Sequence, residues 1–236
     1  MGRSVFGRVL IIAGSDSGGG AGIQGDIKTV TCLGGYAATA ITALTAQNTL
    51  GVFGIHDVPE DFIAKQIRLV LDDIGADALK TGMLNNESVI ETVAESIAPY
   101  PHIPLVLDPV MFAKGGASLL PEAALSCLKK LLIPRAEIIT PNIPEAEYLA
   151  DMGIKNIADM HVAIKKILAF GCQAVLLKGG HLSGETVTDI LLTKAGETIF
   201  EQQRIDSSNT HGTGCALASA IATGIAQKMP LIDAVS

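Results

Sequence analysis

A short, glycine-punctuated stretch near the end of the chain carries residue types that phosphate chemistry needs. Residues 210–215 read Thr-His-Gly-Thr-Gly-Cys, and a run of small residues typical of a helix begins at Ala216. Gly212 and Gly214 let the backbone turn tightly and present successive N–H groups, because no Cβ stands in the way. At a helix N-terminus such N–H groups lack partners within the helix, and the helix dipole favours an anion there. This loop therefore predicts an anion-binding site.

Cys215 falls in the first turn of the same expected helix. The positive end of a helix dipole lowers the pKa of a thiol, which favours the thiolate. An anion-binding loop beside an activated proton acceptor suggests phosphoryl transfer to a hydroxyl group. The alternative is a glycine-rich turn that caps a buried, alanine-rich helix, with Cys215 as a thiol of the core. The loop by itself leaves both interpretations open.

The elements that must position this loop follow from the apolar pattern of the chain. Short apolar runs predict strands at 9–13, 39–44, 78–81, 105–109, 137–140 and 174–177, and helical spacing predicts helices at 23–33, 63–74, 89–97, 125–132, 145–150 and 162–168. Residues 190–192 and 198–200 flank a turn and predict an antiparallel hairpin. The alternation predicts a three-layer α/β/α fold, with a mostly parallel central sheet, helices on both faces and a small antiparallel edge.

The composition is that of a folded domain with a large core. Hydrophobic residues make up 48% of the 236 residues and charged residues 17%. No linker, repeat or low-complexity segment divides the chain, so residues 1–236 are expected to form a single domain. The stretch 14–22 is so rich in glycine that it predicts a loop.

Charge, cysteines and hydropathy exclude several classes of partner. A net charge of −7 without a cluster of Lys and Arg argues against a nucleic-acid surface. The four cysteines are widely spaced and form neither a CxxC nor a Cys/His metal pattern, as expected for reduced thiols in the cytoplasm. The first apolar run is far shorter than the roughly 20 residues that cross a bilayer, and it has no signal-type cleavage site. We expect a cytoplasmic protein without a membrane partner.

Polar residues follow the predicted parallel strands, at the edge where ligands bind in such sheets. Between them these positions supply carboxylates, amides, a lysine and glycines: Gly14–Asp16, Gln47–Asn48, Gly82–Met83, Asp108, Thr140–Asn142 and Lys178–Gly180. Buried charge is costly unless it is paired or coordinated, so such a cluster suggests a site, although loops are polar in any case.

Three of these residues, with Glu145, have chemistry suited to a metal phosphate complex. Asp108, Asn142 and Glu145 supply the oxygen atoms that Mg²⁺ prefers, and Lys178 could neutralise a phosphate in transfer. The alternatives are an exposed first-turn residue for Glu145 and a surface lysine in a turn for Lys178. His211 could line the site or serve as a hydrogen-bonded loop residue.

Two competing nucleotide motifs fail on their details. Residues 20–25 fit G-x-G-x-x-G, but the first glycine lies well beyond the strand and no acid follows between Asp26 and Asp57 to hold a ribose. A Walker A loop would need a lysine where Asp26 stands. Asp26 could instead be a favourable partner of the helix dipole.

Several stretches, taken in order, resemble one family. They are residues 13–29 (AGSDSGGGAGIQGDIKT), 41–49 (ITALTAQNT), 80–84 (KTGML), 107–111 (LDPVM), 140–147 (TPNIPEAE), 176–181 (LLKGGH) and 210–215 (THGTGC). The chain is similar over nearly its whole length to the hydroxymethylpyrimidine/phosphomethylpyrimidine kinases of thiamine synthesis, within the ribokinase-like superfamily. The resemblance implies two ATP-dependent phosphorylations of one pyrimidine, first to the monophosphate and then to the diphosphate.

The resemblance also implies roles for individual residues. Gln47 would hydrogen-bond the aminopyrimidine edge, and the pocket would be completed by Gly14, Asp26, Met83 and Val110. Asp108 and Glu145, with Asn142, would organise Mg²⁺ and its waters. Lys178 and Thr213 would face the nucleotide phosphates. Cys215 stands where most ribokinase-like sugar kinases have an aspartate base, and amides of the loop that contains Gly212 and Gly214 would stabilise the transferring phosphoryl group.

Some features of the chain depart from the family or leave its activity open. Gly25 replaces an alanine that many relatives have. The sequence stops within an expected helix after Leu231, whereas family members continue with a further helix that helps cover the nucleotide; either the sequence is a piece of a longer chain, or its adenine pocket is incomplete. A pyridoxal kinase of the same branch is the nearest alternative, and a non-catalytic pyrimidine-binding domain is another. Gln47 favours the pyrimidine kinase. The resemblance further implies a homodimer.

Overall fold

The structure is a computed structural model, and it describes residues 7–111, 120–207 and 209–236. Its strands form one nine-stranded sheet in the order β3-β2-β1-β4-β5-β6-β7-β8-β9. The strands are β1 (Arg8–Asp16), β2 (Tyr36–Asn48), β3 (Gly51–Asp57), β4 (Ala78–Thr81), β5 (Leu105–Leu107), β6 (Ile138–Ile139), β7 (Ala174–Leu177), β8 (Thr186–Thr193) and β9 (Gly196–Gln203). The strands from β2 to β7 in this order pair in parallel, while β3, β8 and β9 are antiparallel to their neighbours.

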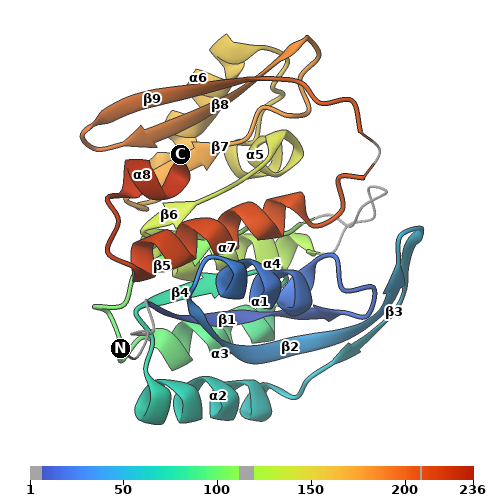
Figure 1. Cartoon of the computed structure of the whole chain (residues 1–236), viewed down its shortest axis with the longest axis vertical. Coiled ribbons are helices and arrows are strands. Elements are labelled where there is room, and N and C mark those ends of the chain that lie inside the picture. Colours follow the sequence, from blue (N-terminus) through green and yellow to red (C-terminus); the bar gives the residue numbers. More distant parts are fainter. Residues whose placement is uncertain (1–6, 112–119, 208) are drawn as a thin grey trace.

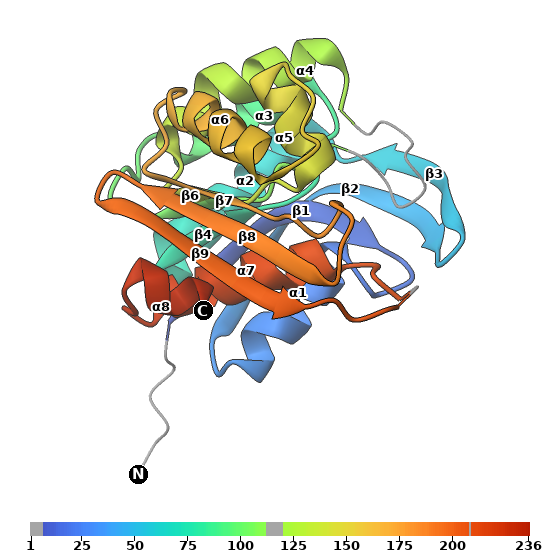
Figure 2. The ribbon, with the colours of Figure 1, turned by 90° about the horizontal axis from the view of Figure 1, so that it is seen from above.

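Helices cover both faces of this sheet, so the predicted three-layer architecture is confirmed (Figures 1 and 2). The helices are α1 (Gly22–Cys32), α2 (Glu60–Leu69), α3 (Glu87–Ile97), α4 (Glu122–Cys127), α5 (Ile143–Ala150), α6 (Ile157–Leu168), α7 (Thr213–Ala226) and α8 (Leu231–Val235). Helices α1, α7 and α8 lie on one face and α2 to α6 on the other (Figure 2). Short π-helical segments extend α2 and α4. None of the helices in the described ranges is long and apolar enough to cross a membrane.

The period-two geometry of β1 explains why one strand contributes to two cores. Leu10 and Ile12 pack in the core beneath α2 to α6, whereas Val9, Ile11 and Ala13 pack against α1 and α7. A strand buried on both faces reads as a continuous apolar run, which is why its sequence predicts it well. The same holds for β4, β5 and β7, which are also fully buried.

Two expectations for the N-terminal part were wrong. Strand β1 continues through Ser15 to Asp16, where a loop was predicted, and its register with β2 shifts past Gly14. Strand β3 forms between the predicted strand at 39–44 and the predicted helix at 63–74, where no strand was expected, and it pairs with the second half of β2 as an exposed arm (Figure 1). Phe53 and Ile55 of β3 are exposed, so this strand depends on pairing with β2 and lacks the alternation of a half-buried strand.

Candidate active site

The carboxyl edge of the sheet contains a topological switch point between β1 and β4. The chain passes from β1 to β2 on one side and reaches β4 on the other, and ligands bind in the crevice that such a reversal creates. Gly14 and Met83 meet here, because a Cβ on Gly14 would lie 2.6 Å from the Met83 methyl group. The Thr42 hydroxyl donates to the Met83 carbonyl at 2.9 Å. The structure thus brings two predicted pocket residues into contact.

The predicted anion loop packs directly on the glycine-rich loop that follows β1. Gly212 has a φ of +83°, and a Cβ there would lie only 1.9 Å from the Gly20 carbonyl oxygen, so no other residue fits this position. Helix α7 then begins at Thr213, whose N–H and hydroxyl both point to the Thr210 carbonyl. Within the described ranges, the N–H groups of Gly214 and Cys215 have no backbone acceptor. These two donors are available to an anion, as predicted for a helix N-terminus.

Lys178 joins this loop from the end of β7. Its Nζ lies 3.3 Å from the position that a Cβ on Gly214 would take, and 3.8 Å from Asp108 Oδ1. Its side chain remains 15% exposed. The lysine and the free amides of α7 therefore provide positive charge on one side of the site.

Beneath the loop lies a buried group of charged and polar residues, which we call the Lys80 cluster: Lys80, Asp26, Ser219 and Asp108. Lys80 Nζ is 2.8 Å from Asp26 Oδ2 and 3.9 Å from Asp108 Oδ2, and the Ser219 hydroxyl donates to Asp26 Oδ1 at 2.7 Å. Burial disfavours the lysine charge, but the carboxylates of Asp26 and Asp108 raise the pKa of Lys80 above its usual value. The lysine is therefore a fixed cation.

The position of Asp26 changes how it can act. Its side chain has no exposed surface, because α1 and α7 close over it and Lys80 occupies its other side. Asp26 thus contacts the site through Lys80 and α7. Neither the role of Lys80 nor that of Ser219 was predicted; a lysine inside the otherwise buried strand β4 was the only signal in the sequence.

The expected depression of the Cys215 pKa is wrong. Burial raises the pKa of this thiol to about 12; Lys80 lowers it, and Asp108 and Asp26 raise it further. The helix dipole acts within the first turn, but removal of the thiolate from water and two nearby carboxylates outweigh it. Cys215 therefore rests as a neutral thiol.

Asp108, Asn142 and Glu145 lie next to one another at the carboxyl ends of β5 and β6. Asn142 and Glu145 form a capping box at the start of α5, in which each side chain accepts the other's backbone N–H at 2.9 and 2.8 Å. Glu145 is buried, not exposed. Burial raises its pKa to about 7; Lys178 lowers it and Asp108 raises it.

This carboxylate pair fits a divalent cation. Within the described part of the chain, Asp108 Oδ2 is a buried oxygen with no hydrogen-bond partner. Two buried carboxyl groups repel one another when both are charged, and a hard cation with oxygen ligands relieves that cost. Asp108 and Glu145 would hold such an ion, with Asn142 positioned beside them by the capping box.

On the acceptor side of the site, one histidine links three segments. We call this the His211 cluster: Asp16, Thr45, Gln47 and His211. His211 Nε2 lies 2.9 Å from Asp16 Oδ2 and 3.4 Å from Gln47 Nε2. Thr45 Oγ1 lies 3.1 Å from Gln47 Oε1 and 2.9 Å from the Ser15 carbonyl oxygen, and either oxygen can accept its single proton. Gln47 thus stands at the end of β2, facing the anion loop, while Val110 follows Asp108 at the end of β5.

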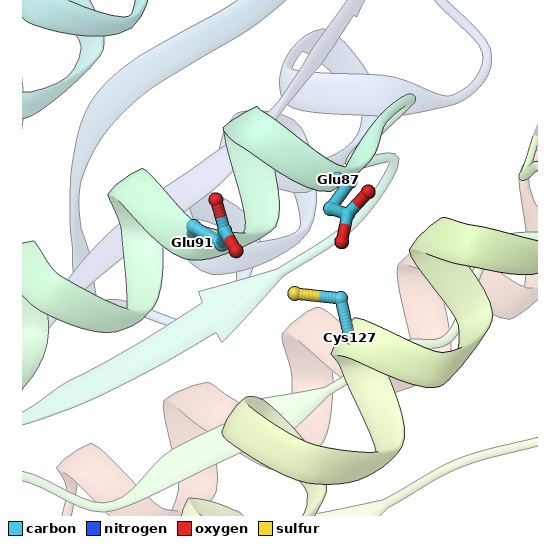
Figure 3. A group of neighbouring side chains, drawn as sticks. All are labelled: Glu87, Glu91 and Cys127. Atoms are coloured by element: carbon cyan, nitrogen blue, oxygen red, sulfur yellow. The ribbon is translucent and has the colours of Figure 1, made fainter.

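A further group of possible metal ligands lies between α3 and α4. Glu87, Glu91 and Cys127 place their ligand atoms within 4.8 Å of one another (Figure 3). Burial and the carboxylates of Glu91 and Glu87 raise the pKa of Cys127, so its thiol is protonated at neutral pH. Two exposed carboxylates beside a neutral thiol form a weaker set of ligands than Asp108 and Glu145.

Comparison with known proteins identifies the family. A sequence model described as phosphomethylpyrimidine kinase matches residues 16–236. The chain belongs to the phosphomethylpyrimidine kinase family. Membership of this kinase family makes it a phosphotransferase, and the resemblance seen in its motifs is confirmed.

Relatives of this kinase are similar along most of the chain. It is 47% identical over 215 residues to the hydroxymethylpyrimidine/phosphomethylpyrimidine kinase of Bacillus subtilis, which covers 91% of this chain and 79% of that protein. It is 51% identical over 230 residues to the thiamine biosynthesis bifunctional protein ThiED of Geobacter sulfurreducens. That match covers 98% of this chain and 47% of the relative, so this chain spans about half the length of the Geobacter sulfurreducens protein.

Solved structures share the ribokinase-like fold. The phosphomethylpyrimidine kinase of Clostridium difficile superposes with a TM-score of 0.86 at 44% identity, covering 97% of this chain and 94% of that one. The pyridoxal kinase of Staphylococcus aureus, in complex with AMP-PCP and pyridoxal, gives a TM-score of 0.90 at 32% identity over 98% of this chain and 84% of that one. A nucleotide analogue in such a close neighbour implies that this kinase uses ATP.

Proposed function

We propose that this kinase phosphorylates 4-amino-5-hydroxymethyl-2-methylpyrimidine with ATP, first to the monophosphate and then to the diphosphate, in thiamine biosynthesis. The observation that carries the proposal is the meeting of the anion loop with Lys178 and the Gln47 amide at one edge of the sheet. The names of its relatives in Bacillus subtilis and Geobacter sulfurreducens support the same pathway.

The acceptor pocket is formed by residues that suit an aminopyrimidine. The Gln47 amide offers both a donor and an acceptor, which matches an exocyclic amine beside a ring nitrogen. Met83 supplies a polarisable apolar contact for the ring, next to Gly14, which leaves room for it. Val110 adds an apolar side, and Asp26 supports the pocket from below through Lys80.

The phosphate side is formed by Lys178, Thr213, Asn142 and the loop amides. Lys178 and the N–H groups of Gly214 and Cys215 would stabilise the charge that develops on the transferring phosphoryl oxygens. Asp108 and Glu145 would hold Mg²⁺, with Asn142 beside them. When bound, Mg²⁺ neutralises charge on the nucleotide phosphates.

The two phosphorylations differ in how much they depend on Cys215 as a base. In the first step the substrate hydroxyl oxygen attacks the γ-phosphorus, the bond to the bridging oxygen of ADP breaks, and the hydroxyl proton passes to the Cys215 thiolate. Since the thiol rests protonated, only its ionised fraction acts as base. In the second step the attacking phosphate oxygen is already largely deprotonated near neutral pH, so this step depends less on Cys215.

Pyridoxal is a second candidate substrate, because pyridoxal kinases of Bacillus subtilis and Staphylococcus aureus superpose with TM-scores of 0.90. The purified protein is incubated with Mg-ATP and either hydroxymethylpyrimidine or pyridoxal, and the products are followed by mass. Mono- and diphosphorylated pyrimidine support the proposal. Pyridoxal phosphate alone transfers the assignment to that vitamin, and no product from either compound overturns both.

We further propose that residues 1–236 act as one catalytic domain and that the protein is a cytoplasmic homodimer. The single continuous sheet supports one domain. All four cysteines are free, which suits a reducing compartment. No described residue pairs with the outer edge of β3, and this edge, with exposed Phe53 and Ile55, offers a surface for a second copy. Sedimentation of the purified protein tests the dimer.

A further inference from the structure

The His211 cluster holds a chain of hydrogen bonds whose direction can be worked out. It begins at Asp16, which is 3% exposed and accepts N–H groups from Gly18 at 2.7 Å and Ala21 at 2.8 Å. Burial opposes the charge of this carboxyl, but hydrogen bonds from His211, Ala21 and Gly18 hold its pKa below the usual value. Asp16 is therefore charged and can only accept.

A charged Asp16 fixes the proton on His211. The ring nitrogen Nε2, 2.9 Å from Asp16 Oδ2, must carry a hydrogen to donate to this carboxylate. In the structure the same N–H faces Gln47 Nε2 at 3.4 Å. Two donors do not attract one another, so the amide oxygen, not its nitrogen, belongs on the His211 side.

The other flank of the amide agrees with this direction. Thr45 Oγ1 lies 2.9 Å from the Ser15 carbonyl oxygen and 3.1 Å from Gln47 Oε1. Its single proton goes to the nearer Ser15 oxygen, so two oxygen atoms that can only accept face each other on this flank. Turning the amide by 180° exchanges its two atoms, so that the nitrogen donates to Thr45 Oγ1 and the oxygen accepts from His211. Because oxygen and nitrogen of an amide are told apart by their hydrogen bonds, the two flanks define one orientation.

We propose that His211 is a positioning residue for substrate choice: held by Asp16, it locks the Gln47 amide so that one fixed donor–acceptor edge faces the pyrimidine. The inference rests on the proposed function of the site. With both flanks of the amide occupied, its remaining N–H and oxygen lone pair form an edge that can pair with a ring nitrogen and an exocyclic amine together. Pyridoxal has no exocyclic amine and gains less from this edge.

The test compares His211→Phe with His211→Gln in the full chain. KM and kcat of the first phosphorylation are measured for hydroxymethylpyrimidine and for pyridoxal, together with KM for ATP. For His211→Phe we expect KM for the pyrimidine to rise about 10- to 100-fold, while kcat and KM for ATP stay within about threefold, because a site built for hydrogen bonds discriminates through their loss. His211→Gln, which keeps an N–H at similar reach, should recover most of the affinity.

His161→Phe is the matched control. His161 also contacts a carboxylate, Glu197, at 2.9 Å. Glu197 pairs with Leu192, which in turn pairs with Val175 near the beginning of β7. His161 therefore lies away from the carboxyl ends of the strands, where the candidate site is. This variant should leave the KM for the pyrimidine within about twofold of the original.

Several outcomes overturn the inference. Equal rises of KM for pyrimidine, pyridoxal and ATP would make His211 a purely structural loop residue, as would an unchanged KM in His211→Phe. If the unmodified protein makes no phosphorylated pyrimidine, the proposed function fails and the inference with it. Should His211→Phe not fold, Asp16→Asn makes the same test. The neutral amide of the variant can donate to His211 Nε2, so the proton on this nitrogen and the orientation of the Gln47 amide are no longer fixed. Asp16→Asn should therefore reduce the difference in KM between the pyrimidine and pyridoxal.

Discussion

The Lys80 cluster and the His211 cluster both pair a cation or ring N–H with an aspartate, yet they differ in burial. Lys80 and Asp26 have no exposed side-chain surface, whereas the His211 side chain is 19% exposed. A buried ion pair is costly to break because one charge is left without water or partner. A rim hydrogen bond breaks at lower cost because water replaces it. The Lys80 cluster therefore holds α7 in place, and the His211 cluster can change which substrate is preferred.

Cys215 lies on the side of the Lys80 cluster and should show the largest effect. Cys215→Ala is expected to lower the rate of the first phosphorylation by about 10²- to 10⁴-fold, the range for loss of a general base. The second phosphorylation, measured with the monophosphate as substrate, should fall much less. Cys32→Ala, which alters an exposed cysteine, is the control. Equal losses of both steps in Cys215→Ala would show that the thiol does not act as a base.

Removing the cation of the Lys80 cluster tests the cost of burial. Lys80→Met should lower the free energy of unfolding by about 3–5 kcal/mol, because Asp26 is left buried and unpaired. The matched change Arg8→Met breaks a pair with Asp77 that is 42% and 27% exposed, and it should cost about 1 kcal/mol or less. Urea denaturation measures both.

The double variant Asp26→Leu with Lys80→Met sharpens this comparison. Replacing both partners by apolar side chains removes the unpaired charge, so much of the lost stability should return. Activity should remain low if the cation also supports Cys215. A double variant no more stable than Lys80→Met would contradict the account of Asp26.

Glu145 shows what burial does to a carboxyl group without a close ion pair. Its pKa is about 7 in the folded protein, against an ordinary value of 4.5. The folded state therefore holds a proton that the unfolded state has released, and stability should fall as pH rises from 4.5 to 7. The loss is about 3 kcal/mol at most in the absence of divalent cations.

Denaturation in EDTA at pH 5 and pH 7.5 measures this loss. Glu145→Gln keeps an oxygen for the capping box and should flatten the dependence on pH. Added Mg²⁺ should restore stability at pH 7.5 in the original protein and do so less in the variant. A pH profile that is the same in both proteins would exclude Glu145 as the group responsible.

Gln47 belongs to the more exposed His211 cluster, and its substitution should have the smallest effect on the stability of the protein. Gln47→Ala removes the two hydrogen bonds that we propose to the pyrimidine, each worth about 0.5–1.5 kcal/mol, so KM should rise roughly 5- to 150-fold. The stability of the protein should change by less than about 0.5 kcal/mol, as for other surface positions. A stability loss as large as that of Lys80→Met would erase the distinction between the clusters.

Much of the fold could be predicted because its central strands are buried on both faces. The apolar runs of β1, β4, β5 and β7 predict buried strands, and the apolar stripes of the helices predict which faces pack on the sheet. Strand β3 could not be predicted, since an exposed arm stabilised by pairing has no apolar alternation of its own. The extension of β1 past Gly14 depends on a register shift with β2, which no local pattern shows.

The sequence by itself determined the family, the anion loop and the residues at the strand ends. Motif order and the rule that ligands bind at the carboxyl edge suffice for these, because both are local or topological. Only the tertiary structure decided that Lys80 pairs with Asp26, that Cys215 rests as a thiol, and that His211 meets Gln47. The physical reason is that burial and long-range pairing set charge and hydrogen-bond direction, and neither depends on neighbours in sequence.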